Sequence, residues 1–373
     1  MCRAVTSFLM QHKVRLQALR HTLDKQGIKA LLITHLPDVR YLCGFTGSNA
    51  ALAVTAKKAV LFTDGRYTAQ ARAETQGARV VISKKSALAD ACVLLESSLG
   101  KKARAAYDPE HTSVAGFAAM RSAISAPRRR GFFSPLEKPI VSELRMVKDT
   151  DELRYMTEAA ALGNSLFHAV LPHIQPGVPE TEIAASLEFF ARSLGAEGMS
   201  FETIVASGPR SALPHGRATS HKTPRNGFVT LDFGVILKGY CSDMTRTVCV
   251  GKPGSLERSA YDAVLEAQEA AVAAVRPGVT CGEVDEAARG KLRKAGLAKY
   301  FTHSTGHGVG LEIHESPRVA AGQTLELKPG MVITIEPGIY MPGKFGIRIE
   351  DMVVVTERGG KVLTPVTKAL IEL

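Results

Sequence analysis

Four carboxylates and one histidine in this chain have types and spacing suited to chemistry. The acids form two pairs, Asp232 with Asp243 and Glu336 with Glu350, and His307 lies between the pairs in the sequence. Each acid is embedded in an otherwise apolar strand segment. Such a set supplies the ligands of a two-metal hydrolase. Ordinary surface carboxylates on edge strands are the alternative.

The first acidic pair is expected on a hairpin. Residues 229–236 and 240–248 are rich in β-branched and aromatic side chains and flank a short break, which is typical of two antiparallel strands. If Leu237 and Lys238 form the loop, Asp232 lies directly opposite Asp243, with Cβ atoms roughly 5 Å apart.

The second acidic pair has a similar setting. Residues 331–336 and 345–350 flank a Pro-Gly turn at 342–343, so Glu336 can face Glu350. Like charges directly opposite each other destabilise a sheet. The two pairs together therefore predict bound cations.

His307 lies in a glycine-rich segment that also contains His303 and His314. Glycines on both sides of His307 let the backbone approach a ligand closely. The same glycines argue against a helix in which His303 and His307 would form a helical zinc pair. A histidine in a loop is often merely exposed, but three of them beside four acids favour a ligand.

Six motifs of this chain occur in the order of a known superfamily. They are Leu231-Asp232-Phe233-Gly234, Ser242-Asp243-Met244-Thr245-Arg246-Thr247, Thr305-Gly306-His307-Gly308-Val309-Gly310, His314-Glu315-Ser316-Pro317, Ile335-Glu336-Pro337-Gly338 and Arg348-Ile349-Glu350-Asp351. They resemble the metal motifs of the pita-bread metallopeptidases, which include aminopeptidase P, prolidase, methionine aminopeptidase and creatinase. The resemblance covers essentially the whole chain.

The resemblance implies a role for each matched residue. Asp232 and Asp243 would bind one metal ion, His307 and Glu336 would bind the other, and Asp243 and Glu350 would bridge the two. Glu336 would also carry the proton of the attacking water.

Further residues would touch the substrate or the ligands. By the same resemblance, His215 and His314 would contact the substrate and steady the tetrahedral intermediate, and His303 would lie on the substrate side. Thr245 and Arg348 each lie two residues from a ligand on the same strand face, which makes them expected partners of the ligands.

An internal repeat supports a duplicated fold. Pro-Gly-Val occurs at 176–178 and again 101 residues later. Each copy is expected to begin a helix, Glu180 to Leu194 and Gly282 to Ala295, with glycine just past the end. A pseudo-twofold relation would bring the acidic pairs to the seam between the halves, where ligand sites are common.

The expected fold class is α+β with two domains in 373 residues. Residues 141–373 would form the catalytic pita-bread domain, made of duplicated αβ halves with a curved antiparallel sheet. Residues 1–140 alternate strands with helices, which predicts an α/β domain. It opens with a helix from Thr6 to Gln26, and a helix from Glu143 to Leu162 links the domains.

Two segments of the first domain carry a resemblance of their own. Residues 38–49 and 63–67 resemble the N-terminal domain of aminopeptidase P, prolidase and creatinase. In relatives this domain reaches a neighbouring subunit, which implies a homodimer or a larger homo-oligomer. The segment Arg40 to Asn49 is expected as a loop, and a purely structural role for Arg40 and Phe45 is the alternative.

Charge and cysteine content exclude other classes. The net charge of +11 arises from basic residues spread along the chain, and no nucleic-acid-binding motif accompanies them. The six cysteines lack metal or disulfide spacing, which predicts reduced thiols in a cytoplasm. The apolar run before residue 11 is too short for a signal peptide, and no membrane span is expected.

The predicted function is a dinuclear-metal Xaa-Pro aminopeptidase that releases the residue before a proline. A ligand set of four carboxylates and one imidazole favours Mn²⁺, with Co²⁺ or Zn²⁺ possible. No basic residue stands out as a partner for a dipeptide's carboxylate, since Arg348 is expected behind Glu350, so longer peptides are preferred here. Xaa-Pro dipeptidase (prolidase) is the alternative. A catalytically silent peptide-binding module on the same fold is a remote third.

Overall fold

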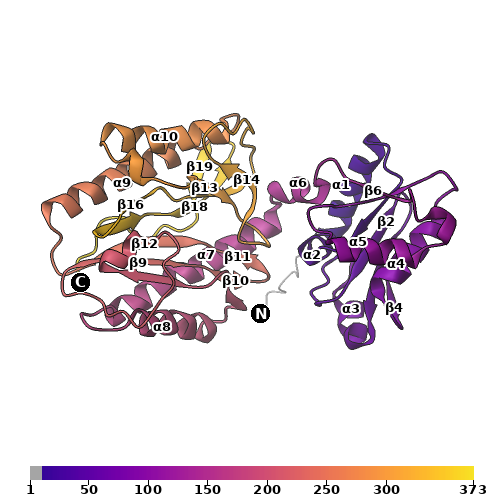
Figure 1. Cartoon of the computed structure of the whole chain (residues 1–373), viewed down its shortest axis with the longest axis horizontal. Coiled ribbons are helices and arrows are strands. Elements are labelled where there is room, and N and C mark those ends of the chain that lie inside the picture. Colours follow the sequence, from indigo (N-terminus) through magenta and orange to yellow (C-terminus); the bar gives the residue numbers. More distant parts are fainter. Residues whose placement is uncertain (1–10) are drawn as a thin grey trace, which may run out of the picture. The chain divides into compact units, whose positions relative to one another are not determined.

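The computed structural model describes residues 11–373. Contacts between residues divide the chain into two units, Met1–Arg145 and Met146–Leu373, which are coloured indigo to purple and magenta to yellow in Figure 1. The α+β class expected from the sequence is confirmed. No helix within residues 11–373 has the length and apolar character needed to cross a membrane.

The first unit is built on a six-stranded mixed sheet in the order β4-β3-β2-β1-β5-β6. Strands β1 to β3 pair antiparallel, whereas β4, β5 and β6 each pair parallel with a neighbour. Helices α4 and α5 bury apolar side chains on this sheet. The elements are α1 (His12–Lys25), β1 (Ala30–Ile33), α2 (Leu36–Cys43), β2 (Ala51–Thr55), β3 (Ala59–Asp64), the 3₁₀ helix η1 (Gly65–Tyr67), α3 (Thr68–Glu74), β4 (Arg79–Ser83), α4 (Ala87–Ser98), β5 (Ala105–Tyr107), α5 (Val114–Ala123), η2 (Ala126–Arg128) and β6 (Phe133–Pro135).

One local prediction for the amino-terminal third lies partly outside the described residues, and another differs from the structure. The expected opening helix begins partly outside the described residues, and its described part is α1. The segment expected as a loop from Arg40 is helical up to Cys43, because α2 begins with proline in its first turn and ends at Gly44 in the left-handed region. Phe45 is buried.

The expected linking helix is two helices, α6 (Ile140–Met146) and α7 (Thr150–Val170). The prediction of one continuous helix is wrong because Asp149 begins α7. Its carboxylate accepts hydrogen bonds from the backbone of Asp151 and Glu152, and the Glu152 side chain bonds back to the Asp149 backbone. This capping box satisfies amide groups that a continuous helix would have used internally.

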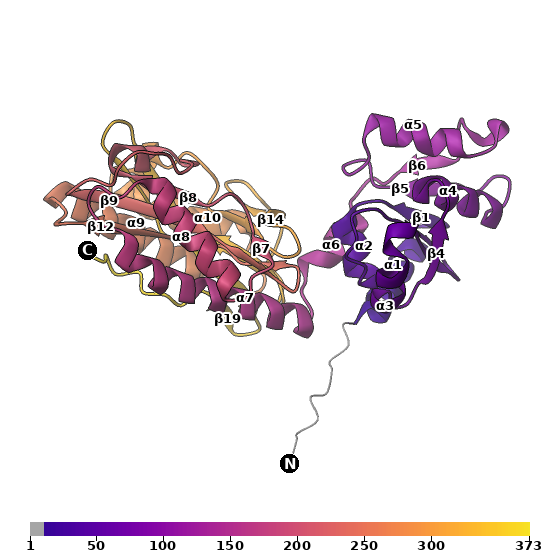
Figure 2. The ribbon, with the colours of Figure 1, turned by 90° about the horizontal axis from the view of Figure 1, so that it is seen from below.

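The second unit places strands between two pairs of helices, α7 with α8 and α9 with α10, as Figures 1 and 2 show. One half packs α7 and α8 on the sheet β12-β9-β8, and the other packs α9 and α10 on β14-β13-β15-β18-β19. The remaining elements are η3 (Leu171–His173), α8 (Glu180–Ser193), β7 (Gly198–Met199), β8 (Ile204–Ser207), η4 (Gly208–Ala212), β9 (Gly227–Phe233), β10 (Val235–Leu237), β11 (Tyr240–Cys241), β12 (Met244–Val250), α9 (Ser255–Ala274), α10 (Cys281–Lys294), η5 (Ala298–Tyr300), β13 (Gly306–Gly308), β14 (Glu315–Val319), β15 (Val332–Ile335), β16 (Gly338–Met341), β17 (Phe345–Arg348), β18 (Asp351–Thr356) and β19 (Gly359–Val362).

The repeat found in the sequence corresponds to equivalent helices in the two halves. Helices α8 and α10 have the same length of 14 residues, and their first residues are separated by the same offset as the two Pro-Gly-Val copies. Each helix covers the sheet of its own half through buried residues. The strands that carry the acidic pairs follow each helix in the chain.

Candidate metal centre

The register of the first acidic hairpin differs from the prediction by two residues. The turn consists of Lys238 and Gly239, both with positive φ, 51° and 78°, as a two-residue type I′ turn requires. Asp232 therefore lies opposite Thr245 in the β9–β12 pair, and not opposite Asp243. A shift of two residues keeps every side chain on its face, so both acids still point to the same side of the sheet.

The second acidic pair is arranged as expected. Strands β16 and β17 pair with Gly338 opposite Arg348, and β15 and β18 pair with Ile335 opposite Asp351. The two strand pairs have the same register. If this register continues through the residues that join β15 to β16 and β17 to β18, Glu336 lies opposite Glu350.

His307 meets the acids of both pairs. Its Nε2 atom lies 3.3 Å from Glu336 Oε1 and 3.7 Å from Asp243 Oδ2. One ligand atom each of Asp243, His307 and Glu350 lies within 4.8 Å of the others. His303 is outside any helix and His307 is in β13, which confirms that they do not form a helical pair.

Burial of these acids makes the site electrostatically unfavourable without cations. Loss of solvent raises the pKa of Asp243 and of Glu350, and neighbouring carboxylates raise both further. Burial likewise raises the pKa of Glu336 to about 7. Burial lowers the pKa of His307, which favours the neutral imidazole that metals bind.

The residues present fit a pair of divalent cations. Asp232 Oδ1 is buried and has no hydrogen-bond partner in the protein, and a buried polar atom of this kind needs a partner. The donor set of carboxylates and one imidazole matches hard to borderline divalent ions. Cations at this position would also offset the repulsion that raises the acids' pKa values.

Arg348 has a different partner from the one expected. Its guanidinium forms an ion pair with Asp232, and it reaches Glu350 through a hydroxyl group. Its Nε atom donates to Thr245 Oγ1 at 3.1 Å, and the Thr245 hydroxyl donates to Glu350 Oε2 at 2.6 Å. Thr245 therefore connects Arg348 to Glu350.

Tyr340 was not identified from the sequence. Its hydroxyl accepts a hydrogen bond from Arg348 Nη1 at 2.7 Å and lies 2.9 Å from His303 Nε2. His303 is therefore connected to Asp232 through Tyr340 and Arg348. Period-two spacing could have found Tyr340, which lies on β16 four residues after Glu336.

The two histidines expected near the substrate are exposed at this site. The His314 ring lies 4.4 Å from that of His307. His215 is close enough to lower the pKa of His314 and of His303 by charge repulsion, although burial is the larger cause in both. His215 and His314 thus border the acidic centre without any observed ion pair between them.

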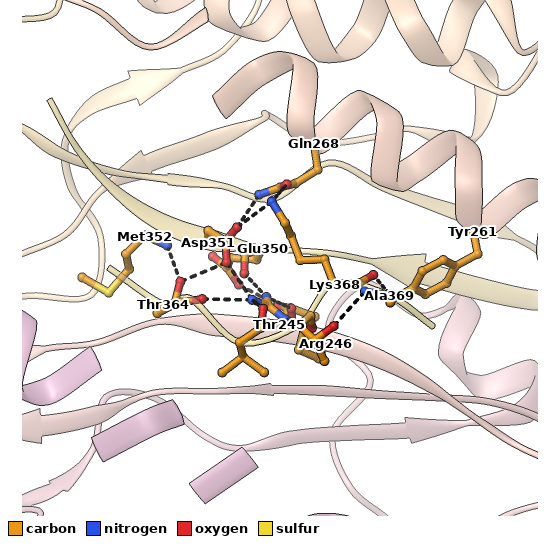
Figure 3. A network of polar contacts seen from close by, with 12 residues as sticks. Thr245, Arg246, Tyr261, Gln268, Glu350, Asp351, Met352, Thr364, Lys368 and Ala369 are labelled. Carbon is orange, nitrogen blue, oxygen red and sulfur yellow. Dashed lines mark hydrogen bonds and ion pairs between the residues drawn. The ribbon is translucent and has the colours of Figure 1, made fainter. Parts of the chain in front are cut away.

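Behind Glu350 lies a buried clamp centred on Arg246, shown in Figure 3. Arg246 is 1% exposed, and its guanidinium forms a 2.7 Å ion pair with Asp351. It also donates to the main-chain oxygens of Thr245 and Glu350. The clamp therefore holds the backbone of a predicted ligand from the side opposite its carboxylate.

Three further carbonyl oxygens and three further donors complete the clamp. Arg246 donates to the carbonyls of Thr364, Val366 and Thr367. Asp351 accepts hydrogen bonds from Gln268 and Thr364 and pairs with Lys368 at 3.3 Å.

Comparison with known proteins places this geometry in a family. Residues 154–357 match the model of metallopeptidase family M24, and residues 15–147 match that of the creatinase/prolidase N-terminal domain. The chain belongs to metallopeptidase family M24. It is therefore a hydrolase of a family that implies divalent metal ions.

Relatives within the family are named as proline peptidases. An Xaa-Pro dipeptidase from Pyrococcus horikoshii is 35% identical, over 94% of this chain and 96% of its own. The structure of an Xaa-Pro dipeptidase from Bacillus anthracis is 38% identical with a TM-score of 0.92, covering 97% of this chain and 100% of that one. An X-Pro aminopeptidase from Thermotoga maritima is 36% identical with a TM-score of 0.85, covering 96% and 99%.

Proposed function

We propose that this protein is a metal-dependent Xaa-Pro dipeptidase. The observation that carries the proposal is the cluster of Asp243, His307 and Glu350, with Glu336 beside His307, in a chain similar over nearly its whole length to Xaa-Pro dipeptidases. This replaces the aminopeptidase predicted from the sequence as the main interpretation. An Xaa-Pro aminopeptidase remains the second candidate, because a structure of that name is also similar over nearly the whole chain.

Two divalent ions, with Mn²⁺ favoured, would be held by the acids and the histidine predicted from the sequence. These are Asp232, Asp243, His307, Glu336 and Glu350. When bound, such ions supply a Lewis-acidic centre that activates water and polarises the scissile carbonyl. The remaining steps belong to side chains of the protein.

Glu336 is the proposed proton carrier. Its carboxylate Oε1 lies 3.3 Å from His307 Nε2, inside the proposed metal centre, where a carboxylate can accept the proton of the attacking water. The Thr334 hydroxyl donates to Glu336 Oε1 at 3.1 Å and fixes that oxygen. The proton taken from water would pass to the proline nitrogen as the peptide bond breaks.

His215 and His314 are the proposed contacts to the tetrahedral intermediate. Both are exposed beside the acidic centre, and burial lowers the pKa of His314. Each imidazole would donate one hydrogen bond to the developing oxyanion. His303, Thr245 and Arg348 hold the surrounding groups in place.

Arg318 offers a partner for the carboxylate of a dipeptide, which the sequence did not reveal. It lies directly opposite His307 in the β13–β14 pair, and opposite residues place their side chains on the same face. The Arg318 side chain is exposed. A guanidinium beside the metal centre recognises a carboxylate with paired hydrogen bonds, which favours a substrate that ends at proline.

The test compares Ala-Pro and Ala-Pro-Ala hydrolysis by the wild-type protein and its Arg318 variants. Wild-type kcat/KM should favour Ala-Pro at least tenfold. Arg318→Ala should lower kcat/KM for Ala-Pro by about tenfold to a hundredfold, the value of a charged hydrogen bond, and should spare Ala-Pro-Ala. Arg358→Ala, an exposed arginine in the β18–β19 turn, is the control. Preference for Ala-Pro-Ala in the wild type would establish the aminopeptidase instead.

We also infer a homodimer or larger homo-oligomer in a cytoplasm, with no nucleic-acid partner. Reduced thiols support a cytoplasmic location, because none of the five described cysteines forms a disulfide. They are Cys43, Cys92, Cys241, Cys249 and Cys281. Burial raises the pKa of Cys43, Cys92 and Cys241 to about 12, so these thiols are unreactive. Light scattering of the purified protein tests the assembly, and a single-chain mass would contradict it.

A further inference from the structure

Four metal-ligating side chains outside the catalytic unit meet at one edge of the first unit's sheet. Strands β1 and β5 are parallel neighbours in the order β2-β1-β5-β6. After β1 the chain continues to β2, and after β5 it continues to β6. Because β2 and β6 lie on opposite sides of the β1–β5 pair in the sheet, the two connections diverge. In open α/β sheets ligands bind at the carboxyl ends of strands where connections diverge in this way.

Two of the four side chains follow β1 and two follow β5. His35 precedes α2, and Asp38 is in its first turn. Asp108 and His111 lie in the loop between β5 and α5. The imidazoles of His35 and His111 are stacked, with ring centroids 3.7 Å apart and planes inclined by 21°. Segments more than 70 residues apart in the sequence therefore place nitrogen and oxygen donors together.

The donor atoms are close enough to share one small cation. One ligand atom each of His35, Asp38 and His111 lies within 4.8 Å of the others, and His35 Nδ1 is 3.3 Å from Asp38 Oδ2. Tetrahedral zinc with ligand bonds of about 2.0–2.2 Å separates its donors by roughly 3.4 Å. The His35–Asp38 distance of 3.3 Å already matches this separation, and a donor atom of His111 lies within 4.8 Å of both.

Neighbouring groups orient these donors. His111 Nδ1 lies 3.0 Å from Asp108 Oδ2, the carboxylate–histidine arrangement that orients a histidine to bind metal through its other nitrogen. Arg145 donates to Asp38 Oδ1 at 2.7 Å, while Asp38 Oδ2 faces His35. With neutral imidazoles, the two carboxylates and Arg145 leave a net negative charge, which favours a divalent cation.

A small cavity adjoins the same four side chains. Its volume is about 10 Å³, and the rest of its lining consists of residues 31–33 of β1 together with Thr34, Leu136 and Val141. That volume holds roughly one water molecule or one ion. Asp38 is 3% exposed and His35 15%, whereas His111 is 28% exposed, so an ion could enter past His111.

We propose that His35, Asp38 and His111, oriented by Asp108, bind one divalent transition-metal ion, with Zn²⁺ the best match to the donor set. Two imidazoles and a carboxylate are typical zinc ligands, and water would complete four-coordination. The site lies in the first unit and uses none of the residues assigned to the catalytic centre. We expect it to stabilise the first unit by tying the end of β1 to the end of β5.

The test counts zinc ions bound to the metal-stripped full-length chain. Calorimetry and elemental analysis after desalting should give one more zinc ion per chain for the parent than for His35→Ala or His111→Ala. His21→Ala, an exposed histidine on α1, is the matched control and should retain the parent's number. Asp108→Asn should keep the site but weaken its affinity by about tenfold to a hundredfold.

Peptidase activity serves as an independent check on folding. His111→Ala should hydrolyse Ala-Pro in Mn²⁺ with the parent's kcat/KM, because His111 is not part of the proposed catalytic machinery. The zinc difference can be read even if the protein proves not to hydrolyse Ala-Pro, so the two proposals fail separately. Equal zinc content in the parent, His35→Ala and His111→Ala would overturn the proposal, as would anomalous scattering that places no zinc between these side chains.

Discussion

Replacing Arg246 by methionine should destabilise the catalytic unit more than any exposed charge change. Methionine fills much of the same volume but removes the more buried of the two cations paired with Asp351, and Lys368 remains as the other. It also leaves main-chain oxygens such as those of Thr245 and Glu350 without their donor. Removing one partner of a buried ion pair costs about 3–5 kcal/mol.

The size of the unit converts that cost into a melting temperature. For domains of this length each kcal/mol shifts Tm by about 2–4 °C, so a loss of about 4 kcal/mol lowers Tm by about 8–16 °C. The assay is differential scanning calorimetry of metal-stripped protein, because bound metal adds its own stabilisation by mass action. Arg246→Lys should recover only part of the loss, since lysine cannot reproduce the fork of donors.

An exposed ion pair provides the control. Arg293 pairs with Glu286, and both side chains are 59% exposed, so Arg293→Met should leave Tm almost unchanged. A double variant, Arg246→Met with Asp351→Asn, should lose less than the sum of the single losses because each change removes the other's partner. If Arg246→Met melted within about 2 °C of the parent, the clamp would not stabilise the unit as argued.

Other predictions address the metal centre. In the metal-free protein, Tm should fall as pH rises from about 4.5 to about 7. Burial raises the pKa of Glu336 to about 7, so over this range the folded state binds more protons than the unfolded state. Mn²⁺ should reverse the trend because bound ligands are ionised, and calorimetry across this pH range with and without Mn²⁺ checks both results. Asp243→Ala or Glu350→Ala should abolish dinuclear binding and turnover, as titration calorimetry and Ala-Pro assays would show. His215→Ala should keep both metals and lose roughly 10² in kcat; an empty site in that variant would contradict its role.

Periodicity predicted the faces of the acidic strands better than their pairing. Asp232 and Asp243 share a face because side chains alternate with period two, which holds for any even shift of register. The register of β9 and β12 depends on whether the turn consists of residues 237–238 or 238–239. The positive φ of Gly239 shows that Gly239 is part of the turn. A Lys-Gly pair is a weaker turn signal than Asn-Gly, so the sequence did not decide between the loops.

Contacts between distant segments could not be predicted from one sequence. The partner of Arg348 is Asp232, 116 residues away, and neither residue's spacing points to the other. Arg318 lies opposite His307 across the β13–β14 pair, whose register shifts between His307 and Gly308, so counting along the sequence does not give the pairing. The break between α6 and α7 was readable in principle, since Asp149 followed three residues later by Glu152 is a capping-box pattern.

The most direct test of the central claim is a titration of metal-stripped protein with Mn²⁺ while Ala-Pro hydrolysis is followed. The four acids and His307 predict no turnover in chelator and activity that rises until two equivalents per chain are bound. Turnover that persists in chelator, or a protein that binds Mn²⁺ at this centre and still leaves the Ala-Pro bond intact, would contradict the account.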